Sequence, residues 1–283
     1  MNARRNHAGW PEGARIAVSL VLNIEEWSKD EAAPYMNPFP VNAVIRRDFP
    51  TITDREYGYR AGLWRLLDIL EQREVKGTAV VSGLAAERHP EVVQEISNRG
   101  HEVAGHSYDQ SVSLVSMSNE EEEEAIRRSI AAIEKAIGQK PHGWLSPGCR
   151  CTERTLGLLA RYGFSWHSDF LNDDLPDLVS AGDGELVEIP YSLILNDYRF
   201  FLQSDRTPQE MVDVLTSEFD QLYEEGESDP LLMTIGIHPH IIGRPGRAGA
   251  LAQFLDYARS HDKVWFARRG EIAEWWRSHS GKE

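Results

Sequence analysis

The sequence predicts an α/β fold, and within that class a parallel α/β barrel. Short apolar, β-rich runs alternate with helical patterns along the chain, as in successive βα units. Polar residues follow the ends of several runs, where an α/β scaffold builds its active site. A length of 283 residues is ordinary for a one-domain barrel, so we expect a single domain over residues 1–283.

The N-terminal part of the chain predicts two strands and one helix. Arg15–Leu22 is β-rich and bounded by turn residues, which is typical of a buried strand. Prolines from Pro34 to Pro50 then predict a long irregular loop, a feature that is often functional in a compact domain. Leucines at helical spacing predict a helix over Ala61–Arg73, and Gly77–Ser82 is expected to form the second strand.

The middle of the chain continues the alternation. Pro90 is expected to open a helix that Gly100 ends, and His101–Ala104 to form the third strand. Ser118 begins an acidic helix that Gly138 closes, and its first-turn glutamates complement the helix dipole. Further strands are expected at His142–Leu145, Phe164–Ser168, Leu186–Pro190, Leu231–Ile237 and Val264–Ala267.

Four more helices complete seven or eight βα units. They are expected over Thr152–Tyr162, from Thr207 to near Gly226, over Ala248–Ser260 and through Trp275 and Trp276. The helix that begins at Thr207 has the clearest signal, because Thr207-Pro208-Gln209-Glu210 is a capping box with proline at the first helical position.

Composition excludes several classes of partner. The formal net charge of −15 disfavours nucleic acid and anionic membranes, since no basic patch offsets it. No apolar run approaches the length of a membrane span, and the basic N-terminus lacks the apolar stretch of a signal peptide. Cys149 and Cys151 are too close to bridge each other and too few for a zinc framework. We therefore expect a cytoplasmic protein that acts on a small-molecule substrate.

Carboxylates and histidines follow three of the predicted strands. Glu25 and Glu26 follow the first; their side chains should alternate in direction, so that one faces the pocket as a general base or a metal ligand. His106 follows the third strand and suits proton transfer or metal binding. His238 and His240 follow the most apolar strand, which makes His238 the best placed catalytic candidate.

Six segments spread along the chain are specific when taken together. They are Val21–Glu26, Arg55–Gly58 with Gly62, Gly100–His106, Asn172–Pro176, Asn196–Phe200 and Ile241–Arg247. In these segments the chain resembles the polysaccharide deacetylase (NodB-homology) superfamily, carbohydrate esterase family 4, and most closely the branch of the PuuE allantoinase and the cyclic imide hydrolases. The resemblance implies a distorted (β/α) barrel, hydrolysis of a carbon–nitrogen amide bond, and a homo-oligomer, commonly a tetramer.

The chain departs from the metal-dependent members of that superfamily at two motifs. Those members carry Asp-Asp after the first strand and His-x-x-x-His after the third, where this chain has Glu25-Glu26 and His106 with Gln110. Glutamine is a poor zinc ligand, and the allantoinase-like members depart in the same way and are thought to work without metal. We expect either no required cofactor or one divalent metal, zinc, held by Glu26 and His106.

Further side chains are candidates for substrate binding. Bulky aromatics are expected to edge the barrel mouth, which would suit a small planar ring better than a sugar chain; they are Trp27, Tyr57, Tyr108 and Trp144. Polar candidates are Arg150, Asp169, His240 and Arg244. Arg244 lies in a rigid Gly-Arg-Pro-Gly-Arg turn suited to carboxylate or amide recognition, or to an acid across a subunit interface.

The leading hypothesis is ring opening of a small cyclic ureide or imide. Glu25 or Glu26 would act as base with help from His106, and His238 would protonate the leaving nitrogen or stabilise the oxyanion. One alternative is a metal-dependent N-deacetylase of a glycan or peptidoglycan with a third ligand such as Asp109 or His240. The other is a catalytically inactive barrel that serves as a binding module.

Overall fold

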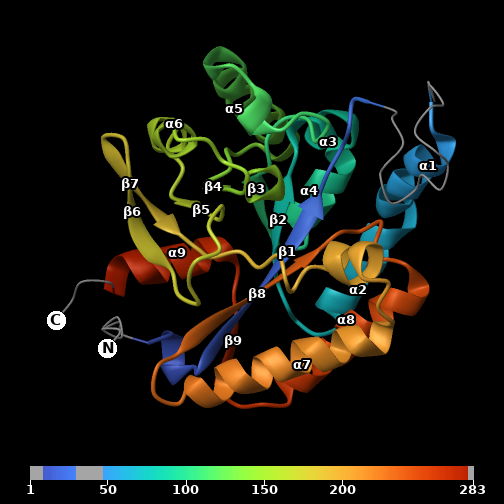
Figure 1. Cartoon of the computed structure of the whole chain (residues 1–283), viewed down its shortest axis with the longest axis vertical. Coiled ribbons are helices and arrows are strands. Elements are labelled where there is room, and N and C mark those ends of the chain that lie inside the picture. The colour runs from blue at the N-terminus through green and yellow to red at the C-terminus, as the bar shows by residue number, and fades with distance from the viewer. Residues whose placement is uncertain (1–8, 30–46, 280–283) are drawn as a thin grey trace.

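The fold is a curled, mostly parallel sheet with helices packed on its outer side (Figure 1). The structure, a computed structural model, describes residues 9–29 and 47–279, so the predicted loop around Pro34, Pro38 and Pro40 lies outside the described residues. The strands are β1 (Ile16–Ile24), β2 (Thr78–Val81), β3 (Glu102–Gly105), β4 (Gly143–Trp144), β5 (Trp166–His167), β6 (Asp177–Ala181), β7 (Gly184–Glu188), β8 (Leu231–Ile237) and β9 (Val264–Phe266). The strand order is β6-β7-β5-β4-β3-β2-β1-β8, and β9 pairs with β1.

The helices follow the strands as the predicted βα units require. They are α1 (Phe49–Tyr57), α2 (Leu63–Glu71), α3 (Gly83–Arg88), α4 (Pro90–Asn98), α5 (Asn119–Ile137), α6 (Thr155–Arg161), α7 (Pro208–Glu225), α8 (Pro245–Arg259) and α9 (Arg269–His279). Among the described residues no helix has the length and apolar character needed to cross a membrane.

The predicted parallel barrel is confirmed, with one local exception at β6 and β7. These two strands form an antiparallel hairpin, and β6 was not predicted. Only two residues, Gly182 and Asp183, join them, which is too short for a parallel crossover, and Gly182 takes a positive φ of 63° in that turn. Every other ladder is parallel, and no ladder of the described residues joins β6 to β8, so the sheet is a half-barrel rather than a closed one.

Two helices lie where no helix was predicted. α1 begins at Phe49, where we expected the proline-rich loop to continue; Asp48 caps it by accepting a hydrogen bond from the Thr51 N–H, and Pro50 fits its first turn. α3 follows Ser82, whose hydroxyl caps the Ala85 N–H. Both helices are short, and caps rather than long apolar periodicity define them.

The predicted capping signals of the longer helices are confirmed. The Thr207–Glu210 capping box is present at α7, and Pro208 opens that helix. Gly138 ends α5 with a left-handed φ of 75°. These local signals fix the helix ends that return the chain to the next strand.

Strand β1 separates the two sides of the sheet. Its nine residues are all buried. Ile16, Leu20 and Leu22 pack with the leucines of α2 and α8 on the outer side, whereas Ala17 and Val21 pack with residues from β5 and β7 on the inner side. Because side chains of a strand alternate, this parity determines which residues beyond the strand end face the interior.

Candidate active site

The candidate site lies at the carboxyl end of β1, where the strand's inward parity continues. Asn23 and Glu25 follow Val21 at steps of two and turn toward the barrel interior. The Asn23 amide donates to the Ile237 carbonyl at 3.2 Å and ties β1 to β8. Glu25 therefore lies among residues that follow β3 and β8.

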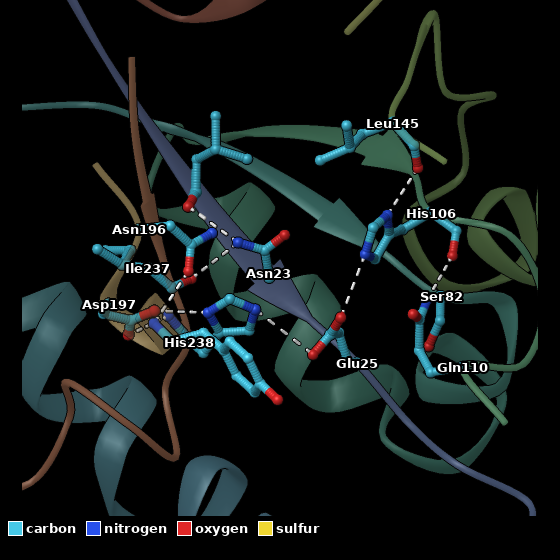
Figure 2. A network of polar contacts seen from close by, with 12 residues as sticks. Asn23, Glu25, Ser82, His106, Gln110, Leu145, Asn196, Asp197, Ile237 and His238 are labelled. Carbon is cyan, nitrogen blue, oxygen red and sulfur yellow. Dashed lines mark hydrogen bonds and ion pairs between the residues drawn. The ribbon is translucent and has the colours of Figure 1, made fainter. Parts of the chain in front are cut away.

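Glu25 lies between two imidazoles (Figure 2). Its Oε1 is 3.3 Å from His106 Nε2, and its Oε2 is 3.7 Å from His238 Nε2. Burial opposes ionisation of this carboxyl, but the charge of His238 and the hydrogen bond with His106 outweigh it and lower the pKa of Glu25 to about 2. Glu25 is thus a carboxylate at neutral pH.

His238 is backed by a second, buried carboxylate. Its Nδ1 lies 2.6 Å from Asp197 Oδ1, while Asp197 Oδ2 accepts the backbone N–H groups of His238 at 2.7 Å and Ile242 at 3.2 Å. Burial disfavours the charged imidazole, but Asp197 and Glu25 outweigh it and raise the pKa of His238 to about 9. His238 therefore holds a proton on Nε2, directed at Glu25.

His106 is fixed in a different way. Its Nδ1 is 2.6 Å from the Leu145 carbonyl, and since a carbonyl only accepts, Nδ1 carries the hydrogen. Nε2 then faces Glu25, and this contact is attractive only when a proton lies between the two atoms. The Glu25–His106 pair can therefore receive a proton taken from water.

Glu26 has the opposite parity and a separate set of partners. Its Oε1 is 2.7 Å from Arg88 Nη1, and its Oε2 is 3.5 Å from His89 Nε2. The predicted pairing of Glu26 with His106 as metal ligands is thus wrong for this structure, because successive side chains point to opposite sides and Glu25 takes the inner one.

Comparison with known proteins places this geometry in a family. A family model described as polysaccharide deacetylase matches residues 54–167. A Schizosaccharomyces pombe protein with the name "Putative polysaccharide deacetylase" is 32% identical, with 94% of this chain and 92% of that protein aligned. A Helicobacter pylori peptidoglycan deacetylase is 25% identical over 75% of this chain and 83% of its own length. The crystal structure of PuuE allantoinase superposes with a TM-score of 0.89 at 33% identity, covering 98% of this chain and 95% of that one.

The chain belongs to the polysaccharide deacetylase family. Its structure matches PuuE allantoinase as well, so this family member is an amide-bond hydrolase of the superfamily that includes both activities. The predicted family and enzyme class are thereby confirmed, while the substrate is not identified by these likenesses.

The described residues at the two metal motifs do not assemble a set of three metal ligands. No group of three or more His, Cys, Asp or Glu side chains within residues 9–29 and 47–279 could hold a metal ion. Gln110, at the second histidine position, donates its amide to the His106 carbonyl at 2.7 Å. Asp109, the suggested third ligand, instead accepts from Ser28 and Ser111.

Two predicted binding residues lie next to His238. The His240 ring is 5.9 Å from the His238 ring and 6.0 Å from the Trp27 ring. Burial and the charge of His238 lower the pKa of His240 to about 3, so it is neutral. The Arg55 guanidinium lies over the Trp27 ring, 4.0 Å from its centre. These side chains continue the wall of the site beyond His238.

Arg244 and Tyr57 form a neighbouring pair. The Arg244 guanidinium lies 3.7 Å from the Tyr57 ring, and its Nη2 is 2.5 Å from Asp54 Oδ1. Arg244 thus has an acid partner within its own chain.

Three other predicted substrate contacts are not assembled at the site. Trp144 is fully buried, packs edge-on against Phe164 and donates to Ser146, so it cannot edge the mouth. Tyr108 stacks under Arg128 of α5 and donates to Glu87 of α3. Arg150 is exposed, and its side chain has no ion pair or hydrogen bond with the described part of the chain.

Asp169 lies buried behind His106 rather than facing a substrate. It accepts the Ser146 N–H at 2.6 Å and the Ser146 hydroxyl at 2.9 Å. Burial raises its pKa to about 6 despite these bonds and the nearby His106. Asp169 therefore supports the loop after β4, which also carries the Leu145 carbonyl.

Asp197 is the functional residue that sequence reasoning missed. It was noted only as part of the Asn196–Phe200 segment and was given no role. No strand precedes it, since Asn196 makes an isolated bridge to Gly236, so the search for polar residues at strand ends could not find it. The sequence feature that could have identified Asp197 is its place in the Asn196–Phe200 segment, where an acid lies between an asparagine and aromatic residues.

Proposed function

We propose that this protein opens the ring of a small cyclic ureide or imide by hydrolysing one of its amide bonds. The observation that carries the proposal is the position of Glu25 between two imidazoles, of which His238 is kept protonated by Asp197. This arrangement supplies a proton acceptor and a proton donor on the two sides of one carboxylate.

The reaction follows from these contacts. A water molecule held by Glu25 and His106 loses a proton to that pair as its oxygen bonds to the ring carbonyl carbon. His238 stabilises the oxyanion and then gives its Nε2 proton to the leaving nitrogen as the carbon–nitrogen bond breaks. Because the two oxygens of Glu25 contact both rings, the proton taken from water can return to His238 across this carboxylate.

Two further observations favour a ring over a polymer. The aromatic rings of His240 and Trp27 follow His238 in a series of edge-on contacts, and the likeness to the PuuE allantoinase extends over nearly the whole of both chains. A small planar ring that packs against these aromatic side chains would place one carbonyl near Glu25.

The test is turnover of defined rings. Purified protein is incubated with allantoin, hydantoin and succinimide, and ring opening is followed by chromatography, with a His238→Gln variant as the blank. Opening of at least one ring by the native protein but not by the variant is expected. Turnover of acetylated chito-oligomers with no ring opening would refute the proposal.

A second candidate is N-deacetylation of a glycan or peptidoglycan, which the names of two relatives favour. It predicts acetate release from acetylated oligomers, strengthened by added zinc. Measuring acetate release with and without zinc on the same preparation separates the two candidates.

The assembly and compartment remain predictions. We propose a single catalytic domain over residues 1–283, a cytoplasmic location and a homo-oligomer, a tetramer by resemblance. Light scattering coupled to size-exclusion chromatography measures the number of subunits.

A further inference from the structure

A cavity of about 450 Å³ lies beside His240 at the N-terminus of α8. His240 lines this cavity and also contacts the ring of His238, so it connects the cavity with the candidate site. Two arginines of the Gly-Arg-Pro-Gly-Arg turn, Arg244 and Arg247, also line it. The reaction proposed above uses none of this space.

The cavity carries more positive than negative charge. Asp54 is the one carboxylate among its lining residues, and it is paired with Arg244. Arg247 rests on the Phe201 ring at 4.6 Å and donates to the Ile241 carbonyl at 3.3 Å, and within the described residues it has no carboxylate partner. One guanidinium is therefore held in place without a counter-charge.

His240 brings an unsatisfied polar group to the same cavity. It is only 8% exposed, and its ring nitrogens make no hydrogen bond with residues 9–29 or 47–279. A neutral imidazole carries one N–H donor, and in His240 this donor has no partner among the described residues. A ligand oxygen would supply that partner.

The backbone of α8 adds a third contribution. Pro245 opens the helix, and the N-terminus of a 15-residue helix favours a negative group. Gly246 lines the cavity, and a Cβ built on it meets no atom within 4 Å. The missing side chain leaves room for a ligand next to the helix end.

We infer that this cavity binds a carboxylate, and that the preferred substrates are cyclic amides that bear an acidic arm. The inference rests on the proposed function, because the arm would extend past His240 while the ring lies at His238 and Glu25. Arg247 would pair with the carboxylate, Arg244 would share its guanidinium between it and Asp54, and His240 would donate a hydrogen bond.

The decisive variant fills the cavity without changing any charge. Gly246→Leu places a side chain in the open space, and Gly249→Leu is the matched control, since Gly249 is in the same helix, is equally open and does not line the cavity. Hydantoin and hydantoin-5-acetic acid are compared as substrates. We expect Gly246→Leu and Arg247→Met to lower the ratio of kcat/KM for the acidic ring over the neutral ring by about 10-fold or more, the size of a charge-assisted hydrogen bond. Gly249→Leu should leave that ratio within about twofold.

A binding measurement separates this inference from the proposed function. Calorimetric titration with succinate requires no turnover, and Gly246→Leu and Arg247→Met should each raise its dissociation constant about 10-fold, while Gly249→Leu should not. If the native protein opens no ring, the proposed function fails while the titration still tests the cavity. Equal selectivity ratios in the native protein, Gly246→Leu and Arg247→Met would overturn the assignment to substrate. Succinate binding that ignores these two substitutions would overturn the carboxylate site itself.

Discussion

Two neighbouring carboxylates, Glu25 and Glu26, have opposite surroundings in this structure. Glu25 faces His106 and His238 in the barrel interior. Glu26 faces the other side, where it forms an ion pair with Arg88 and contacts His89, and Tyr59 stacks on His89 at 4.2 Å. The two residues have the same chemistry and differ only in the parity that β1 imposes.

The comparison shows how a paired-acid motif can be divided between two tasks. The inner acid keeps a low pKa because imidazoles face it, and burial alone would have raised that pKa. The pKa of the outer acid is also lowered against the effect of burial, but by hydrogen bonds and charges from His89 and Arg88. Glu26 is therefore already committed to a cation and contributes structure rather than proton transfer.

The largest expected effect is the difference in kcat between variants that replace Glu25 and variants that replace Glu26. Glu25→Gln should lower kcat for ring opening by about 10³-fold or more, because it removes the proton acceptor between the two imidazoles. Glu26→Gln should cost less than about fivefold, because the ion pair that it breaks is partly solvent-screened. Steady-state kinetics, with circular dichroism as the check on folding, measures both. Similar losses in the two variants would show that the parity argument fails.

A second prediction concerns the carboxylate behind His238. Asp197→Asn should lower kcat about 100-fold, because His238 loses the partner that keeps its Nε2 proton in place. The pKa of His238 should fall from about 9 toward its ordinary value. NMR titration of the imidazole reports this shift directly. Asp256→Asn is the matched control, since it removes a carboxylate paired with Arg73 far from the site; an unchanged His238 titration in Asp197→Asn would argue against a positioning role.

Much of the centre of the site, the group of Glu25, His106 and His238, could be predicted from the sequence. Alternation of short strands and helices placed Glu25, His106 and His238 at one end of a parallel sheet, because the polar residues directly follow apolar runs. Which glutamate faces inward could not be predicted, since it depends on where the inward parity of β1 starts. Ala17 and Val21 show that parity only once the barrel interior is known.

The predictions for the residues around this centre were wrong or incomplete for other reasons. Trp144 is the second residue of the two-residue strand β4, and its side chain fills the core, so its size indicated packing and not a mouth. Tyr108 is drawn to Arg128, a contact between distant segments that no local pattern shows. Asp197 follows no regular strand. In each case tertiary contacts decided the outcome.

The pH dependence is the third prediction. His238 has a folded pKa of about 9, above its usual 6.5, so its stabilising contribution is fully present below pH 6.5 and is lost as pH rises through about 9. Glu25 has the opposite sign: its contribution is present above pH 4.5 and is lost as pH falls toward 2. The rate of ring opening should also depend on pH, because only protonated His238 can serve as the proton donor. It should fall about tenfold per pH unit above pH 9, and Asp197→Asn should move this alkaline limb of the rate profile to lower pH. An alkaline limb that stays in place in this variant would exclude His238 as the proton donor.

The smallest expected effect is that of metal removal. The acid that would complete a metal site, Glu26, is held by Arg88, and the backbone N–H of Gln110 donates to the Glu26 carbonyl at 3.1 Å, which fixes the glutamine next to it. Dialysis against a chelator should leave kcat/KM for ring opening within about twofold, since hydrolysis is proposed to run on Glu25, His106 and His238. Replacing Gln110 with His restores the motif histidine but leaves Glu26 paired, so this variant should still bind less than stoichiometric zinc by elemental analysis. Stoichiometric zinc in the native protein, with activity lost on chelation, would contradict the division of the two acids and favour the deacetylase.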